Sequence, residues 1–116
     1  MINYDEFSKV EMTVGKIISA VPVEGSEKLL KLSVDFGERN EDGSSKPRQV
    51  VSGIAKYFPD ISVLVDTKHP FVTNLEPRMI MGLESQAMIL AASDKNSGGF
   101  SLLNVDNSIG EGTKLS

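Results

Sequence analysis

The stretch LKLSVDF at residues 30–36 decides the fold class of this sequence, because apolar and polar side chains alternate along all of it. A two-residue period is that of a β-strand with one buried face. Residues 37–47 follow as a loop rich in glycine, serine and charge, and residues 48–54 form the next expected strand. The middle of the chain is therefore predicted to be a β-hairpin with a long solvated connection.

Short apolar segments on both sides of this hairpin predict a mainly β chain. Apolar residues of one parity run from Val10 to Ala20, and Gly15 marks the place where a bulge or tight bend is expected. Proline, glycine, asparagine and aspartate separate the later segments. The expected strands are residues 10–20, 30–36, 48–54, 71–74, 87–92 and 100–105. Five or six strands this short leave exposed edges unless the sheet closes, so a small closed or partly open barrel is predicted.

The rest of the chain leaves room for little helix and for one domain. Residues Tyr4–Val10 could form one or two helical turns, and residues 55–58 a short connector that Pro59 ends. The chain has 116 residues, fewer than the roughly 150 of a typical domain. Hydrophobic residues make up 40% and charged residues 24%, as in ordinary globular proteins. One compact domain over residues 1–116 is expected.

Composition excludes much familiar enzymology. There is no cysteine and only one histidine, so disulfides, thiolate metal sites and histidine-pair zinc sites are ruled out. Ser52 and Ser85 lie in no nucleophile-elbow pattern, and the acid pair Glu41-Asp42 belongs to the solvated loop. We therefore expect no catalytic residue, no metal site and no cofactor.

Charge and hydropathy restrict the partners. Residues Met1–Glu6 lack the basic start and apolar centre of a secretory signal, and the longest clean apolar run is Ala87–Ala92. Crossing a bilayer needs about 20 apolar residues, so a cytoplasmic protein with no membrane insertion is expected. The formal net charge of −4 has the wrong sign for binding nucleic acid by bulk electrostatics. Any nucleic-acid site must be a local basic patch.

Two expectations concern burial. Met79, Met81 and Met88 could form an adaptable surface for a partner, but methionine more often fills gaps in a core, so core positions are predicted. His69 precedes Pro70 beside an expected strand, with no acid cluster at ligand spacing. A surface or edge histidine without a role is predicted.

Six short segments carry a resemblance to a known family. They are VGKI at 14–17, VEGSEKLLKL at 23–32, RQVVSGI at 48–54, NLEPR at 74–78, MGLES at 81–85 and GTK at 112–114. Together they resemble the tRNA-binding domain family of stand-alone dimeric tRNA-binding proteins, of bacterial methionyl-tRNA synthetase C-termini and of the phenylalanyl-tRNA synthetase β-chain. The resemblance begins at Phe7. It implies an all-β oligonucleotide/oligosaccharide-binding (OB) fold, a barrel of five strands plus one short helix with N- and C-terminal extensions.

The resemblance implies a tRNA-binding surface across the second and third strands and the loops beside them. Arginine and lysine would meet phosphates there, and asparagine and serine would donate to phosphate or sugar oxygens. The residues placed on this surface are Lys28, Lys31, Arg48, Ser52, Asn74, Arg78 and Ser85. Two departures stand out: Thr13 replaces a basic residue common in relatives, and Gln86-Ala87 replaces an acid and a glycine. One cationic contact fewer and an altered turn are expected.

The resemblance also implies partners. These are tRNA, an aminoacyl-tRNA synthetase, and a second copy of the chain that contacts the first through Tyr4, Phe7 and residues 100–105. Two alternatives stay open: a dimeric chaperone-like relative of the same fold that binds polypeptides, and a module that assembles a synthetase complex. The SGI and NLEPR segments favour RNA, whereas the acidic balance and Thr13 favour the alternatives.

Overall fold

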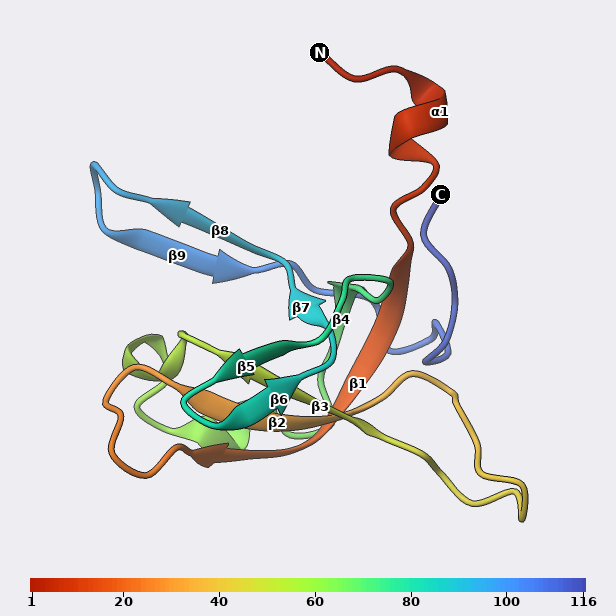
Figure 1. Ribbon diagram of the computed structural model, residues 1–116. Coiled ribbons are helices and arrows are strands. Elements are labelled where there is room, and N and C mark those ends of the chain that lie inside the picture. The colour runs from red at the N-terminus through yellow and green to blue at the C-terminus, as the bar shows by residue number, and fades with distance from the viewer.

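The computed structural model describes all 116 residues, and most of its regular structure is extended (Figure 1). The only α-helix is α1 (Tyr4–Phe7), and two 3₁₀ turns follow the third strand, η1 (Ala55–Tyr57) and η2 (Ile61–Leu64). The strands are β1 (Met12–Pro22), β2 (Leu30–Asp35), β3 (Arg48–Ser52), β4 (Lys68–Val72), β5 (Arg78–Ile80), β6 (Leu83–Ser85), β7 (Met88–Ile89), β8 (Ala91–Asp94) and β9 (Gly99–Leu102). None of the helices is long and apolar enough to span a bilayer.

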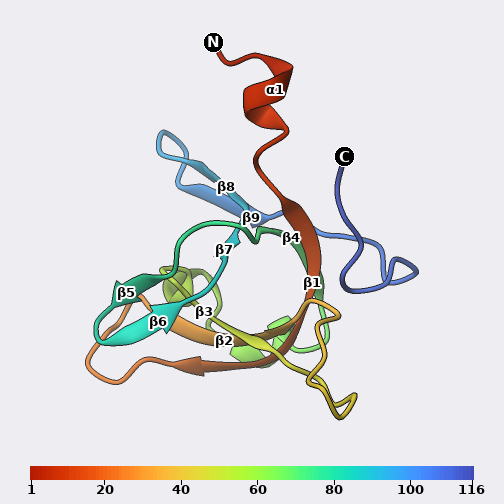
Figure 2. The same cartoon turned by 45° about the vertical axis from the view of Figure 1, so that its right-hand side comes forward.

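Five of these strands form a nearly closed barrel. Their order is β3-β2-β1-β4-β7, every neighbouring pair is antiparallel, and the edge strands β3 and β7 contact each other. In the view turned by 45° about the vertical axis, the strands of the sheet curl into a ring (Figure 2). The prediction of a small OB-type barrel with one short helix and two extensions is therefore confirmed.

The core fills this ring, and the alternation of β2 supplies much of it. Leu30, Leu32 and Val34 are at most 1% exposed, as the sequence pattern predicts. Phe36 packs edge-on against Phe71 of β4, with ring centroids 5.1 Å apart. Burying a large apolar side chain fully is worth roughly 1.5–3 kcal/mol, so these residues dominate the stability of the barrel.

The first strand departs from its predicted parity. Ile17 is fully buried while Ile18 is 42% exposed, and the pairing with β2 shifts between Ile17 and Ser19, so that Ile17 and Ala20 both lie opposite core residues of β2. A β-bulge adds one residue and turns the following side chains to the opposite face. The bulge therefore lies between Ile17 and Ser19 and not at Gly15, where a bulge or tight bend was expected. A Cβ at Gly15 would lie 2.6 Å from both Phe36 and Val34, so this glycine serves close packing.

Two hairpins stand outside the barrel. The predicted strand at residues 87–92 is in fact β7 in the barrel and then β8, which pairs with β9 in an arm that projects from it (Figure 1). The β5–β6 hairpin was not predicted. Its strands have three residues each, and its turn places Met81 and Gly82 at positive φ.

Burial corrects two further predictions. The three methionines are not core residues, because Met79, Met81 and Met88 are 67%, 60% and 46% exposed. Met79 and Met81 belong to the β5–β6 hairpin, which lies outside the barrel and leaves them facing solvent. His69 is not a surface residue, because it lies on β4 beneath the β9 arm and is only 2% exposed.

Both extensions are tied to the start of β1. Helix α1 buries none of its residues, and Asn3 caps it by accepting from the Glu6 backbone N–H at 2.9 Å. The C-terminal segment runs along β1, where Val14 donates to the Thr113 carbonyl at 2.8 Å and Leu115 to the Met12 carbonyl at 2.9 Å. The two chain ends therefore lie on the same side of the barrel (Figure 1).

Candidate nucleic-acid interface

Three predicted site residues line one small hollow beside β3. Ser52 ends β3, Arg78 begins β5, and Ser85 ends β6 directly opposite Arg78. The hollow has a volume of about 70 Å³, and Glu76 also lines it. Arg78 is exposed and makes no ion pair within the chain. The hollow therefore brings the unpaired Arg78 near Ser52 and Glu76.

Lys31 and Lys28 extend this surface along β2. Lys31 is half-buried between two hollows, one of about 220 Å³ that it shares with Arg48 and one of about 380 Å³ that it shares with Glu24 and Met81. Lys28 is exposed in the loop before β2, which Ser26 shapes by accepting from the Lys28 N–H at 3.2 Å. Neither lysine makes an ion pair within the chain.

Arg48 is held by internal partners instead. Its Nε and Nη2 donate to the two carboxylate oxygens of Glu38 at 2.7 and 3.0 Å, and its Nη1 donates to the carbonyls of Thr73 and Gln86 at 2.7 and 3.2 Å. These bonds use four of the five N–H groups of the guanidinium. These hydrogen bonds from Arg48 to Glu38 lower the pKa of Glu38 and raise the pKa of Arg48. Arg48 thus links the two edges of the barrel.

Asn74 and Ser85 also use their side chains internally. The Asn74 amide accepts from the Glu11 N–H at 2.8 Å and donates to the Lys9 carbonyl at 2.6 Å, which fixes the N-terminal extension. Ser85 is 7% exposed, and its hydroxyl accepts from the Val51 N–H at 3.0 Å. The structure therefore gives both residues a positioning role.

The two departures from the family pattern are accommodated in the interior. Thr13 is 3% exposed, and its hydroxyl lies 2.9 Å from that of Thr73. The Gln86 side chain accepts from the Gln49 N–H at 2.9 Å and so fastens the β5–β6 hairpin to β3. Ala87 is not among the residues with positive φ, so the altered turn expected there causes no strain.

Sequence reasoning missed Lys56 and Tyr57, which the fold adds to this end of the barrel. The Ala55 N–H donates to the Lys28 carbonyl at 3.0 Å, so η1 is held against the Lys28 loop. The Lys56 ammonium lies 5.5 Å from the centre of the Tyr57 ring, and that ring stacks on Phe100 at 3.9 Å. Only its position over Tyr57, whose ring stacks on the distant Phe100, distinguishes this lysine from any other surface lysine.

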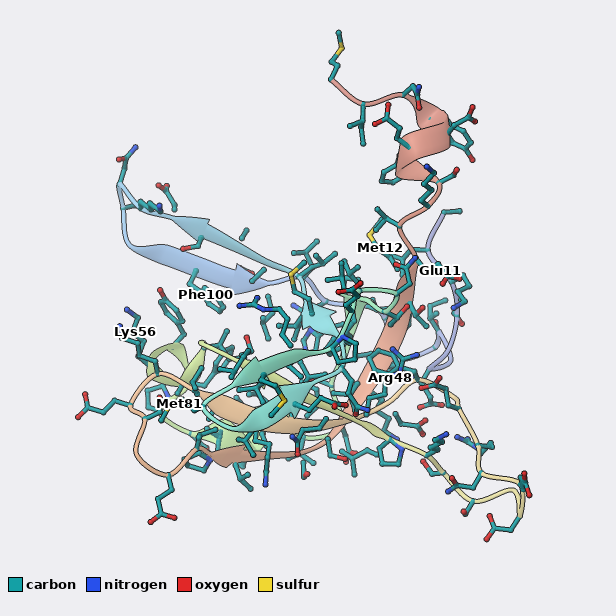
Figure 3. The ribbon with its side chains drawn as sticks, in the orientation of Figure 1. Glu11, Met12, Arg48, Lys56, Met81 and Phe100 are labelled. Atoms are coloured by element: carbon teal, nitrogen blue, oxygen red, sulfur yellow. The ribbon has the colours of Figure 1, made fainter.

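Four cations thus define what we call the basic end of the barrel: Lys28, Lys31, Lys56 and Arg78. None of them makes an ion pair within the chain, which is also true of Lys9, Lys46, Lys68 and Lys95, whereas Lys16, Arg39, Arg48 and Lys114 all do. Lys56 lies on the same side of the molecule as Met81 and Phe100, apart from Arg48 (Figure 3). The chain as a whole has a net charge of −4, and Glu24 and Glu76 line the same hollows as Lys31 and Arg78.

Comparison with known families decides what kind of domain carries this patch. The family described as "Putative tRNA binding domain" matches residues 12–114. The chain belongs to the tRNA-binding domain family. Curated relatives of this tRNA-binding domain include methionine-tRNA ligases from Caldanaerobacter subterraneus, 44% identical over 115 residues, and from Lactococcus lactis, 41% identical over 115 residues. These matches cover 99% and 98% of the chain but only 16% of each ligase.

Solved structures share the fold of this tRNA-binding domain. A MetRS-related protein from Pyrococcus horikoshii is 34% identical, with a TM-score of 0.87 over 100% of this chain and 98% of that one. A CsaA chaperone protein from Picrophilus torridus is 26% identical, with a TM-score of 0.81 over the whole of both chains. The tRNA-binding domain fold therefore accompanies more than one described role.

Proposed function

We propose that this chain is a non-catalytic module, one domain over residues 1–116, that captures tRNA at its basic end by shape and backbone contacts. The observation that carries the proposal is that four cations without ion-pair partners, Lys28, Lys31, Lys56 and Arg78, lie on β2, on β5 and on the segments beside β2 and β3 in a net acidic chain. Family membership supports it. The ligase relatives support a role as part of a methionyl-tRNA synthetase or beside one, where the module would raise tRNA affinity without performing chemistry.

Within this proposal the predicted residues take two roles. Lys28, Lys31 and Arg78, joined by Lys56, meet phosphates, because their cationic groups face solvent unpaired. Ser52 adds an uncharged hydrogen bond from the hollow beside Arg78. Ser85 holds the hollow beside Arg78 in shape through its bond to Val51. Arg48 and Asn74 act further away, where they close the barrel and fix the N-terminal extension.

The salt dependence of tRNA binding tests the proposal. If three to four phosphates are neutralised, log affinity should fall against log salt with a slope of about −3, using roughly 0.7 to 0.9 per phosphate. Filter binding with unfractionated tRNA at several salt concentrations measures this slope. Arg78→Ala should weaken all tRNAs about equally, because a phosphate contact carries no sequence information. Binding that stays flat between low and physiological salt contradicts the proposal.

A homodimer is part of the proposal, because one small barrel with four cations binds a large RNA only weakly. Helix α1 and the residues before it support the homodimer by exposing Ile2, Tyr4 and Phe7, which are 63%, 79% and 43% exposed. In residues 100–105, the other expected part of the contact, Leu102 is 7% exposed and belongs to the core, which leaves Leu103, 45% exposed, as the exposed large hydrophobic residue there. The proposed contact therefore centres on α1, where one patch could serve both subunits across a two-fold axis.

Sedimentation equilibrium at micromolar concentration tests the dimer. We expect a mass of about twice 12.6 kDa for the chain. Replacing both Tyr4 and Phe7 by serine should give folded monomers, because neither residue is buried. Their tRNA affinity should drop at least about tenfold, since the second contact no longer forms at high effective concentration. A mass near 12.6 kDa for the unaltered chain would refute the dimer.

A polypeptide-binding role is the second candidate, and the exposed methionines favour it. Met79 and Met81 lie on the β5–β6 hairpin, and Met88 shares a hollow with Leu75, which is 48% exposed. Methionine-rich surfaces adapt to varied apolar partners. The likeness to a CsaA chaperone protein points the same way. A chain that suppresses aggregation of an unfolded protein and does not bind tRNA would establish this candidate over the first.

A further inference from the structure

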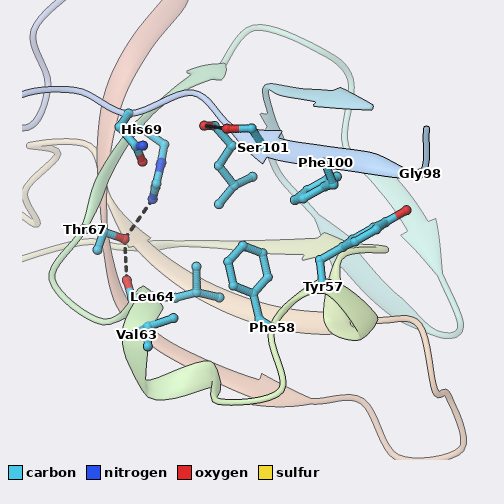
Figure 4. Close-up of a pocket in the computed structure, with 11 residues that line it drawn as sticks. Tyr57, Phe58, Val63, Leu64, Thr67, His69, Gly98, Phe100 and Ser101 are labelled. Atoms are coloured by element: carbon cyan, nitrogen blue, oxygen red, sulfur yellow. Dashed lines mark hydrogen bonds between the residues drawn. The ribbon is translucent and has the colours of Figure 1, made fainter. Parts of the chain in front are cut away.

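A pocket of about 400 Å³ opens beside the basic end, between the two 3₁₀ turns and the β9 arm (Figure 4). Phe58, Leu64 and Leu102 form its apolar wall, and Thr67 and His69 lie at its polar side. Its size lies within the range of about 300–1,000 Å³ of pockets that hold small ligands. Nothing in the proposed phosphate contacts uses this pocket.

The polar groups inside the pocket already have partners. His69 bonds the Leu103 carbonyl through Nδ1 at 2.7 Å and the Thr67 hydroxyl through Nε2 at 2.8 Å. Burial lowers the pKa of His69, so the neutral ring is favoured and offers no charge to a ligand. Asn104 at the rim is different, because it is exposed and its side chain makes no hydrogen bond within the chain. Recognition by polar contacts must therefore come from the rim.

Two parallel aromatic rings form the mouth of the pocket. The rings of Tyr57 and Phe100 are 3.9 Å apart at an angle of 3°, and Phe58 supports Phe100 edge-on at 6.0 Å. Tyr57 is 37% exposed, so it is available to a ligand. Lys56 lies 5.5 Å from the centre of the Tyr57 ring, a weak cation–π contact for an exposed ammonium. A flat ring that stacks on this pair could displace Lys56.

We propose that Tyr57 and Phe100 stack an unpaired base of the bound RNA while Lys56 moves onto the adjacent phosphate. Bases stack on aromatic side chains where an RNA is single-stranded, and stacking tolerates any sequence. The Asn104 amide, which lines the same pocket and has no internal partner, would bond an edge of the base. This inference rests on the proposed function and adds that the RNA is unpaired where it meets η1.

Continuity with the basic end supports a nucleotide as the occupant. The Ala55 N–H donates to the Lys28 carbonyl, so the turn that carries Lys56 and Tyr57 lies against the loop that carries Lys28. Lys28 and Lys56 both make no ion pair, which complements a phosphate beside the base. An apolar peptide side chain would fill the pocket but leave these cations without a counter-charge.

Three probes test the stacking: single-stranded hexa-adenylate, an abasic hexamer with the same phosphates, and unfractionated tRNA. Tyr57→Leu should weaken hexa-adenylate at least fivefold and leave the abasic hexamer unchanged, because only the base stack is lost. Lys56→Ala should weaken both hexamers by similar factors, because it removes a phosphate contact. Tyr57→Trp keeps the platform and places the only tryptophan of the chain there, so hexa-adenylate should quench its fluorescence.

The outcomes separate this inference from the proposed function. If the unaltered chain binds tRNA but Tyr57→Leu binds both hexamers with the affinities of the unaltered chain, the stacking is wrong and the tRNA-binding proposal stands. If the introduced tryptophan responds to a phenylalanine-containing peptide and not to hexa-adenylate, the pocket serves polypeptides and the stacking is also wrong. If the unaltered chain binds no RNA, both proposals fail. Should Tyr57→Leu not fold, the fluorescence of Tyr57→Trp decides alone.

Discussion

Replacing Lys28 and Arg78 together by alanine should weaken tRNA binding about 30-fold at physiological salt. Both side chains are exposed and unpaired, so each is free to meet a phosphate. A hydrogen bond to a charged group is worth roughly 1 kcal/mol or more net, and two such losses correspond to about 30-fold. The salt slope should shrink from about −3 to about −1.5. Filter binding at four salt concentrations measures both quantities.

A matched control separates local contacts from bulk charge. Replacing Lys9 and Lys46 by alanine also removes two exposed, unpaired positive charges, so both double variants have a formal net charge of −6 instead of −4. These two lysines lie in the N-terminal extension and in the loop before β3, outside the basic end. We expect less than a threefold loss for this control. Equal losses in the two double variants would show that tRNA does not bind at the basic end.

Gly15→Ala should lower the free energy of unfolding by about 3 kcal/mol, measured by urea titration. The added Cβ would lie 2.6 Å from Phe36 and Val34 and 2.8 Å from Phe71, and the backbone or these side chains must move to accept it. Overpacking of this kind costs roughly 1–3 kcal/mol, out of a total stability of about 5–15 kcal/mol.

Gly53→Ala is the control for this substitution. A Cβ at Gly53 would meet no atom within 4 Å, and Gly53 has no positive φ. We therefore expect a change between zero and a gain of about 1 kcal/mol, because alanine restricts the unfolded chain. If the two substitutions cost the same, close packing is not the reason for glycine at position 15.

The sequence predicts the barrel well where one face of a strand is buried. The alternation of β2 survives into the structure because Lys31 and Ser33 face outward while their neighbours fill the core. The β5–β6 hairpin escaped prediction because three residues are too few to show a period. Its turn also places Met81 at positive φ, where asparagine, aspartate or glycine would have signalled a hairpin.

The candidate site was harder to predict because the hydrogen-bond and ion-pair partners of a side chain are brought to it by the tertiary fold. Arg48 looks like a free cation in the sequence. In the structure a loop brings it beside Glu38, ten residues earlier, and its guanidinium donates to both carboxylate oxygens of Glu38. Lys56 looks like an ordinary surface lysine until η1 docks beside Lys28. Charge type can be read from the sequence, but whether a charge is free depends on contacts that only the fold establishes.

The bonds of Asn74 have a consequence for the entropy of the N-terminal extension. A four-residue helix that buries nothing would sample many conformations if it were attached by a free linker. Asn74 instead holds the backbone at Lys9 and Glu11, the hinge from which α1 projects. Fixing a residue costs roughly 1–2 kcal/mol of conformational entropy, and at the hinge this ordering already occurs when the barrel folds. A partner that docks on α1 therefore meets a preorganised arm and keeps more of its contact energy as affinity.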